Sequence, residues 1–386
     1  MDFELSAEHL RVRDLARRVA REVVAPRAAA IDEEAKYPED VFAAFRDAGL
    51  LGLVFPKQYG GSGEGVLAMS LAIEEVAKYC CASGLILLLT ALGTRSILFG
   101  GTEAQKQRWL PPVARGEMKA SFLLTEPTGG SDAAALRMTA VRDGGDYVLN
   151  GAKSYASGVS DFCVVYAKTD ASAGARGVSG FIVPRDTPGF SITKYDRKMG
   201  VLGVPTAHYA FENARVPAEN LIGGVENKGF NTAMLSLNSV RPLVGARGLG
   251  LAQGALTYAL AYAREREAFG GPLTEKQAIQ FMFADMALAI ESARLLVYQA
   301  AWLVDQGRYA KADAAYLSVA KTVATEMAVK VSSDALQVMG AQGYMKDHPL
   351  ERHYRDARQL MIVEGTSQIQ RMIISRALID GDLVYE

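Results

Sequence analysis

The spacing of apolar residues predicts helices over the first third of the chain. Ser6 is suited to cap a first helix, whose apolar positions recur at helical spacing from Val12 to Val23. This helix is predicted to end at Pro26, because proline lacks the N–H that a helix interior needs. Further helices are predicted over residues 38–49, 67–79, 83–99 and 102–110, the last before Pro111 and Pro112.

From about Lys119 the pattern changes to short β-rich runs. Glycine and proline turn signals separate these runs, and the last of them ends near Gly223-Gly224. Many short strands at close spacing predict a small barrel or sandwich. The runs are SFLLTEP, DYVLNG, FCVVYAKT, SGFIVP, FSITKY and HYAFENARVP.

The last third returns to a helical pattern, which begins at Phe230. The segment Gly270-Gly271-Pro272 is predicted to break the first of these helices, and an apolar stripe from Ile279 to Val297 marks the next. Long helices with such stripes predict an antiparallel bundle. Two more helices are predicted over residues 318–339 and 371–379.

The composition excludes several classes of protein. The chain has 386 residues, of which 49% are hydrophobic and 22% charged, enough for two or three domains. Its net charge of −1 gives no basic field, so we expect no nucleic-acid or membrane partner. The longest apolar run, residues 85–89, is too short to span a bilayer.

Targeting and redox signals favour a cytoplasmic location. The N-terminal sequence MDFELSAEHL is acidic and polar, unlike a signal or transit peptide. The three cysteines, Cys80, Cys81 and Cys163, form no CxxC pair, so we expect no disulfide framework and a reducing compartment.

Neither a metal site nor a dinucleotide fold is expected. His348 and His353 match no zinc-binding spacing and are interpreted as surface or loop residues. The glycine-rich segment from Phe55 to Gly65 lacks the GxGxxG order and the preceding strand of a Rossmann site.

Candidate chemistry is concentrated where four apolar residues, Leu360 to Val363, run directly into Glu364. Burial beside such a run raises a carboxyl pKa and makes the group a better base near neutral pH. Gly365 lets a ligand or a second backbone come close. A helix corner or cap is the alternative interpretation.

A second candidate is the stretch LLTEPTGGSD, residues 123–132. Its hydroxyls and the free backbone amides around its glycines suit a polar planar ligand or a phosphate. A plain turn between strands is the alternative.

Seven motifs in order along nearly the whole chain resemble those of the acyl-CoA dehydrogenases. The motifs are LLTEPTGGSD, NGAKSYAS, ENARVPAENLIG, YAREREAFGGPL, QVMGAQGY, RDAR and VEGTSQIQR. The resemblance implies a mainly α, α+β chain with an all-α N-terminal domain (1–117), a β-barrel domain (118–226) and a C-terminal four-helix bundle (227–386). It also implies FAD, a homotetramer built as a dimer of dimers, and oxidation of an acyl-CoA thioester to its trans-2-enoyl form.

The resemblance also implies roles for individual residues. Glu364 is the expected catalytic base, which takes the α-proton while a hydride passes to flavin N5. Its backbone N–H and a ribityl hydroxyl of FAD are the expected oxyanion hole. The expected flavin and pyrophosphate contacts are Phe122, Leu124, Thr125, Gly130, Ser131, Tyr155, Ser157, Thr366 and Gln368. The expected substrate contacts are Ser131, Asn238, Arg241 and Gly365. The residues expected to reach the cofactor of a neighbouring subunit are Arg266, Phe269, Gln277, Ile279, Gln337, Val338, Gly340 and Ala341.

Several positions depart from the family's common residues. Tyr155 stands where tryptophan is common, Ser157 where threonine is, Asn238 where aspartate is, and Val363 where tyrosine precedes the acid. These changes alter the flavin packing and the space beside the thioester, and they remove no group that the chemistry requires.

Alternative functions remain open at this stage. The same chemistry could act on a thioester held by a carrier protein, and a flavin monooxygenase could share the fold, although the acid at position 364 favours dehydrogenation. A non-catalytic helical scaffold is a further alternative. The resemblance implies electron-transferring flavoprotein as the electron acceptor.

Overall fold

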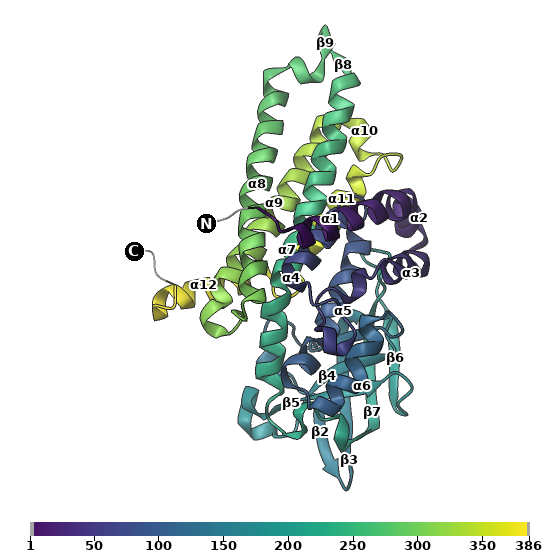
Figure 1. Ribbon diagram of the computed structural model, residues 1–386, viewed down its shortest axis with the longest axis vertical. Coiled ribbons are helices and arrows are strands. Elements are labelled where there is room, and N and C mark those ends of the chain that lie inside the picture. The colour runs from purple at the N-terminus through teal and green to yellow at the C-terminus, as the bar shows by residue number, and fades with distance from the viewer. Residues whose placement is uncertain (1–3, 384–386) are drawn as a thin grey trace.

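The computed structural model describes residues 4–383, and the chain is mainly helical around one curled sheet (Figure 1). The N-terminal region is helical, as predicted, and Ser6 caps its first helix by accepting a hydrogen bond from the His9 N–H. Its helices are α1 (Ala7–Val19), α2 (Ala25–Glu34), α3 (Glu39–Asp47), α4 (Gly65–Ala77), α5 (Cys81–Gly100) and α6 (Glu103–Ala114).

Two predicted helix ends at prolines are wrong. Pro26 lies in the first turn of α2, a position where proline is tolerated, and a π-helical turn (Ala20–Val24) joins α2 to α1. Helix α6 continues through Pro111 and Pro112, whose carbonyls accept hydrogen bonds from the backbone beyond it, among them from the Arg115 N–H at 3.1 Å. Prolines near a helix end therefore need not terminate it.

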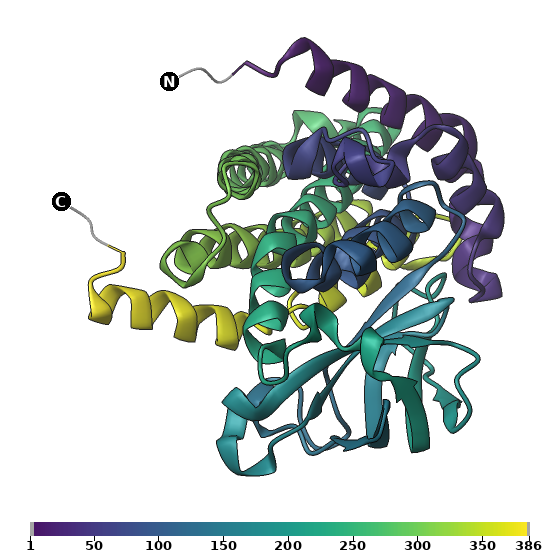
Figure 2. The same cartoon turned by 60° about the horizontal axis from the view of Figure 1, so that its bottom comes forward.

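The middle of the chain forms the predicted β structure, as a curled seven-stranded sheet (Figure 2). The paired order is β1-β4-β2-β3-β7-β6, with β5 on the other edge of β4. Strand β2 is short and mostly exposed, and the hydrophobic pattern did not predict it. The strands are β1 (Ala120–Leu123), β2 (Thr139–Asp143), β3 (Asp146–Ser157), β4 (Phe162–Lys168), β5 (Val178–Pro184), β6 (Phe190–Tyr195) and β7 (Thr206–Pro217).

The C-terminal region contains three long helices that run together away from the sheet, and α12 projects from the body (Figure 1). A two-stranded hairpin, β8 (Glu267–Ala268) with β9 (Gly271–Pro272), joins the first two at their far end. The helices are α7 (Gly229–Glu265), α8 (Gln277–Asp305), α9 (Ala314–Met339), α10 (Ala341–Tyr344), α11 (Leu350–Leu360) and α12 (Ser367–Asp380).

Helix α11 was not predicted, and the interpretation of His353 as a surface or loop residue is wrong. His353 is buried on α11, and its two ring nitrogens lie 2.7 Å from the Pro349 carbonyl and 3.1 Å from the Lys78 carbonyl. The imidazole thus ties α11 to the end of α4. His348 lies in the turn before this helix.

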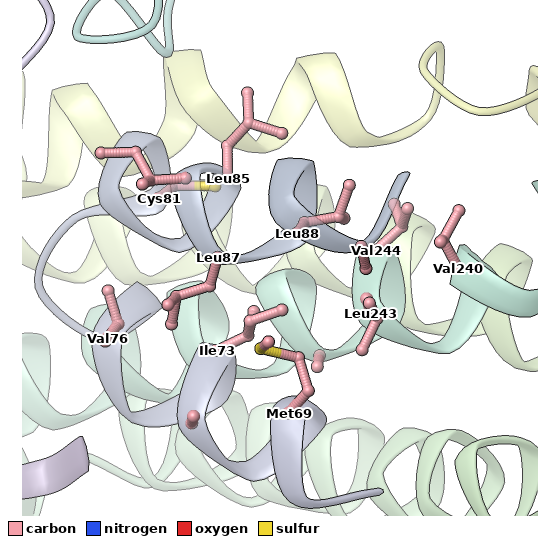
Figure 3. Packing of buried hydrophobic residues seen from close by; sticks show 14 of the residues in the cluster. Met69, Ile73, Val76, Cys81, Leu85, Leu87, Leu88, Val240, Leu243 and Val244 are labelled. Atoms are coloured by element: carbon pink, nitrogen blue, oxygen red, sulfur yellow. The ribbon is translucent and has the colours of Figure 1, made fainter. Parts of the chain in front are cut away.

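The main hydrophobic core joins the N-terminal helices to the C-terminal ones. Apolar side chains of α4, α5 and α7 interdigitate in it, among them Ile73, Leu87 and Leu243 (Figure 3). Helix α5 is long and apolar enough to cross a membrane by length and composition, but 83% of its most apolar window is buried inside the molecule. The apolar run at 85–89 is therefore one part of a core helix.

Helix α7 is pressed against the end of α4 at two glycines. A Cβ atom at Gly250 would lie 2.2 Å from the Glu74 carbonyl oxygen, and one at Gly254 would lie 2.0 Å from that of Lys78. Only glycine permits so close a backbone approach. The rotation of α7 about its axis is therefore fixed by α4.

A buried ion pair holds the loop that follows β1. Lys153 on β3 is fully buried, and its Nζ donates to Glu126 Oε1 at 2.9 Å and to the Leu124 carbonyl at 3.1 Å. Glu126 also accepts from the backbone N–H groups of Arg137 and Met138. Burial lowers the pKa of Lys153 to about 8, although Glu126 opposes the shift. Both residues belong to motifs that the sequence singled out.

We expect Glu126→Gln to destabilise the protein by about 3–5 kcal/mol, because it leaves the Lys153 ammonium buried without a counter-charge. The double variant with Lys153→Met should recover part of that loss. The matched control is Glu117→Gln, which breaks an exposed pair with Arg115 and should leave the stability nearly unchanged, because solvent screens this pair. Thermal and urea unfolding measure the stability of each variant. Equal unfolding midpoints for Glu126→Gln and Glu117→Gln would contradict the role of the Glu126–Lys153 ion pair in stability.

Candidate active site

A cavity of about 520 Å³ lies where the sheet meets the helices. Its walls come from α5, the loop after β1, the end of β3, α7 and the segment between α11 and α12. Apolar side chains of α5 and α7 form one side of it, and polar groups of the sheet form another. Among the predicted site residues, those that line it are Phe122, Leu124, Thr125, Gly130, Ser131, Tyr155, Ser157, Arg241, Glu364, Gly365 and Thr366.

Glu364 lies in the short connection between α11 and α12, with a left-handed backbone (φ 49°). This conformation is uncommon for a residue with a side chain, and it persists only where the surroundings enforce it. Its Oε2 atom is buried and has no hydrogen-bond partner. Burial raises the carboxyl pKa above its ordinary value, while the charges of Arg247 and Lys321 pull it back. A carboxyl in this state is suited to take up a proton.

Two buried side chains hold this connection through its backbone. Lys321 of α9 is fully buried, and its Nζ donates to the Gly365 carbonyl at 2.9 Å. The Gln370 amide donates to the carbonyls of Glu364 at 3.2 Å and of Gly365 at 3.0 Å. With these carbonyls held toward α9 and α12, the Glu364 side chain faces the cavity. Burial lowers the pKa of Lys321 to about 8.

Lys321, Gln370 and Arg247 were not predicted as site residues from the sequence. A charged residue within the apolar positions of a predicted helix, as at Lys321 and Arg247, is the signal that could have found two of them. Gln370 stands inside the motif that contains Glu364. Lys321 and Arg247 contact segments that lie far from their own helices in the sequence, and Gln370 contacts the backbone just before its own helix. A motif does not reveal such contacts.

The sheet side of the cavity presents an aromatic ring and an unpaired hydroxyl. Tyr155 has a left-handed backbone (φ 60°) and is 65% exposed. The Tyr155 and His208 rings pack in a T-shaped arrangement with their centroids 5.0 Å apart. The His208 ring is held by hydrogen bonds of Nδ1 with Ser154 Oγ at 3.0 Å and of Nε2 with Asp196 Oδ2 at 2.8 Å. Ser157 Oγ is buried without a partner. These groups can receive a flat ligand with polar edges.

Two predicted contacts lie outside the lining of the cavity. Asn238 is buried, and its amide donates to the Tyr309 carbonyl at 2.9 Å, so it does not line the site. The prediction of Asn238 as a substrate contact therefore finds no support in this geometry, whereas Arg241, one turn later, does line the cavity. Gln368 is exposed on α12 and also lies outside the lining.

The residues expected to reach a neighbouring subunit lie outside this cavity. Arg266, Phe269 and Gln277 surround the distant hairpin, where Phe269 is 96% exposed. Near the end of α9, Gln337 and Gly340 are exposed, whereas the side chain of Val338 is packed in the core, so only its backbone is free to meet a ligand. Ile279 is partly buried against the core, and Ala341 is exposed at the start of α10.

Three family models match the chain in sequence order. They describe the N-terminal domain of acyl-CoA dehydrogenases over residues 6–117, the middle domain over 121–214 and the C-terminal domain over 227–379. The chain belongs to the acyl-CoA dehydrogenase family. It is therefore an oxidoreductase that acts on acyl-CoA, as the motifs predicted.

Full-length relatives agree with this assignment. A probable acyl-CoA dehydrogenase, FadE25 of Mycobacterium tuberculosis, is 41% identical over 98% of this chain and 97% of its own. The solved butyryl-CoA dehydrogenase of Megasphaera elsdenii is 37% identical, with a TM-score of 0.95 over 98% of this chain and 100% of that one. A chain in a structure described as the electron transferring flavoprotein of Acidaminococcus fermentans is 41% identical, with a TM-score of 0.95 over the same shares.

FAD is the cofactor of this acyl-CoA dehydrogenase, and the residues of the cavity suit it. The buried, unpaired Ser157 hydroxyl and the exposed Tyr155 ring lie on one wall, while the unpaired Glu364 Oε2 lies on another. A planar group with hydrogen-bonding edges and a polar acyl thioester together would satisfy these atoms.

We expect Lys321→Met to lower kcat/KM for an acyl-CoA by roughly 10–100-fold, because a charge-assisted hydrogen bond to the Glu364–Gly365 connection is lost. In the wild type, kcat/KM should fall as the pH rises through about 8, since the ammonium then loses its charge. Lys321→Arg should retain part of the activity and move this alkaline limb upward.

The control for Lys321 is Lys330→Met on the same helix, which removes an exposed ammonium paired with Asp334. A pH profile of steady-state kinetics compares the three variants. An unchanged alkaline limb in Lys321→Met would exclude the positioning role of Lys321.

Proposed function

We propose that this acyl-CoA dehydrogenase converts an acyl-CoA to its trans-2-enoyl-CoA, with Glu364 as the base that takes the α-proton. The observation that carries the proposal is the Glu364 carboxyl, which lines the cavity and has a raised pKa and a buried, unpartnered Oε2. General-base help of this kind is worth about 10²–10⁴-fold in rate. When bound, FAD supplies the acceptor for the β-hydride.

The same connection offers a donor for the thioester carbonyl. The Glu364 N–H has no hydrogen-bond acceptor among residues 4–383. A free N–H beside the base can stabilise the negative charge that develops on the carbonyl oxygen as the α-proton leaves. Base and oxyanion donor therefore belong to one residue, and Lys321 and Gln370 orient both.

Apolar side chains around Glu364 exclude water from the reacting carbons. Leu85, Leu89 and Leu92 of α5 line the same cavity as the base, and Ile362 and Val363 precede the base in the sequence and also line the cavity. Removing water strengthens each electrostatic interaction within the site and keeps the base from being solvated.

We propose that the residues on the sheet side hold the flavin. Phe122, Leu124 and Thr125 would lie against the ring, with Tyr155 and Ser157 on another flank. The loop with Gly130 and Ser131, and Thr366 at the start of α12, would complete the polar contacts. What supports this is that all of them line one cavity together with Glu364.

Electron-transferring flavoprotein is the electron acceptor that we propose. The name of the solved Acidaminococcus fermentans structure, which contains a chain 41% identical to this one, supports a partner of this kind.

We further propose that copies of the chain associate through α8. Four large apolar side chains lie seven residues apart on this helix, so they share one face, and each is at least 50% exposed. A monomer rarely leaves such a stripe in water. The side chains are Phe281, Leu288, Leu295 and Trp302.

We expect Glu364→Gln to purify with bound FAD, because the change keeps the shape of the side chain. It should not lose its flavin absorbance when an acyl-CoA is added without oxygen, because no base takes the α-proton. Anaerobic absorbance titration measures this. Full bleaching by Glu364→Gln would refute the role of Glu364.

The wild-type pH profile gives a second check on the base. Glu364 must be ionised to act, so activity should be lost as the pH falls through its carboxyl pKa, and that pKa lies above the ordinary value of about 4.3. The acid limb of kcat/KM should therefore lie above that value. A limb at or below it would contradict the burial of this carboxyl.

We expect Leu288→Asp with Leu295→Asp to reduce the molecular mass of the particle in solution, since two charges would be buried in the proposed contact. The matched control is Val141→Asp on β2, which alters a comparably exposed apolar side chain far from α8. Light scattering after size exclusion measures the mass. A wild-type monomer, or an unchanged mass in the double variant, would reject the α8 contact.

A further inference from the structure

A second charged group is buried close to Glu364 and has no counter-ion. Arg247 of α7 is fully buried. Its Nη2 donates to the Cys81 carbonyl at 3.3 Å and to Gln359 Oε1 at 3.1 Å, whereas its Nε and Nη1 have no partner. Unpaired N–H groups on a buried cation are costly, so their retention calls for a ligand that pairs with them.

The guanidinium lies directly behind the wall of the cavity. Gln359, which accepts from it, lines the cavity, and so does Leu85, one helical turn after Cys81 on α5. The aliphatic part of Arg247 packs close to Gly84 on the same helix. The arginine therefore stands behind the side of the cavity that is formed by the start of α5 and the end of α11.

No carboxylate compensates this charge directly. Among residues 4–383, Arg247 forms no ion pair, and Asp356, a buried acid on α11, accepts instead from the Val201 N–H. Arg247 lowers the pKa of the Glu364 carboxyl, and the Glu364 Oε2 is also without a partner. Two unpaired groups of opposite charge thus share this part of the site without touching.

We propose that Arg247 and Gln359 form a subsite that selects acyl thioesters whose chain ends in a carboxylate. The inference rests on the proposed function, because it takes Glu364 to mark the α-carbon end of the acyl group. A terminal carboxylate would accept from the free Nε and Nη1 groups, and the planar guanidinium suits two-point pairing with it. The Gln359 side chain, already at the cavity surface, would turn to admit it.

An anion is the ligand that this subsite favours over a neutral chain end. A methyl terminus would leave both N–H groups unpaired and the cation uncompensated, whereas a carboxylate satisfies the donors and the charge together. If Arg247 served only as a counter-charge to Glu364, its loss would affect every substrate alike.

The test compares acyl-CoAs of equal chain length that differ at the far end: glutaryl-CoA against valeryl-CoA, and adipyl-CoA against hexanoyl-CoA. In the wild type, kcat/KM should be at least about tenfold higher for the carboxylate member of one pair. Arg247→Met should lose at least about tenfold more on that member than on its neutral partner, and Arg247→Lys should keep part of the preference.

The matched control is Arg95→Met on α5. Arg95 is also buried and has two unpaired nitrogens. It does not line the cavity, and among the described residues it forms no hydrogen bond to a residue that does. Its loss should leave the ratio between paired substrates unchanged, whatever it does to stability.

The outcomes separate this inference from the proposed function. If no thioester reduces the bound flavin, the proposed function fails. If valeryl-CoA and hexanoyl-CoA are oxidised as well as or better than their dicarboxylic counterparts by the wild type, only the subsite is overturned, even when Arg247→Met does not fold. Equal losses on both members in Arg247→Met overturn it as well.

Discussion

One carboxyl group, Glu364, is held partly buried on a short connection with left-handed backbone, and the rest of the site depends on it. The chain holds that conformation through carbonyl oxygens, which accept from Lys321 and Gln370. The side chain is left unpaired at Oε2 and faces the cavity. The fold thus stabilises the backbone around the base so that the base itself can stay reactive.

The hydrophobic pattern predicted the helices and most strands because burial governs both. It failed where local chemistry or long-range packing decides. Pro26 lies in the first turn of α2, where proline is tolerated. Pro111 and Pro112 lie inside the last turns of α6, and their carbonyls accept hydrogen bonds from the backbone that follows, so the helix continues past them. Strand β2 gains its place from pairing with β3 and not from its own apolar content. Helix α11 is rich in charged residues. His353 is nevertheless buried on it, because its ring nitrogens pair with the carbonyls of Pro349 and Lys78.

The sequence motifs predicted most residues that line the cavity, but they did not predict the buried residues that support it. Residues from three motifs, including Thr125, Tyr155 and Glu364, line a single cavity. Asn238 turns away from it to bond the Tyr309 carbonyl, which no local pattern could reveal. Lys321 and Arg247 were missed for the same reason: each acts across helices that lie far apart in the sequence. A buried charge inside an apolar helix is the trace that such contacts leave in a sequence.

The glycine contacts of α7 have a mechanical consequence. This helix is 37 residues long, about 55 Å, and carries Arg241 and Arg247 on one stretch and the exposed hairpin beyond its end. Because Gly250 and Gly254 touch the α4 backbone, a turn of α7 by a single residue would drive a side chain into a carbonyl. These contacts fix both the rotation of α7 about its axis and its position along that axis. The depth at which Arg241 and Arg247 lie in the protein is therefore set by the contact with α4 and does not depend on movement of the hairpin.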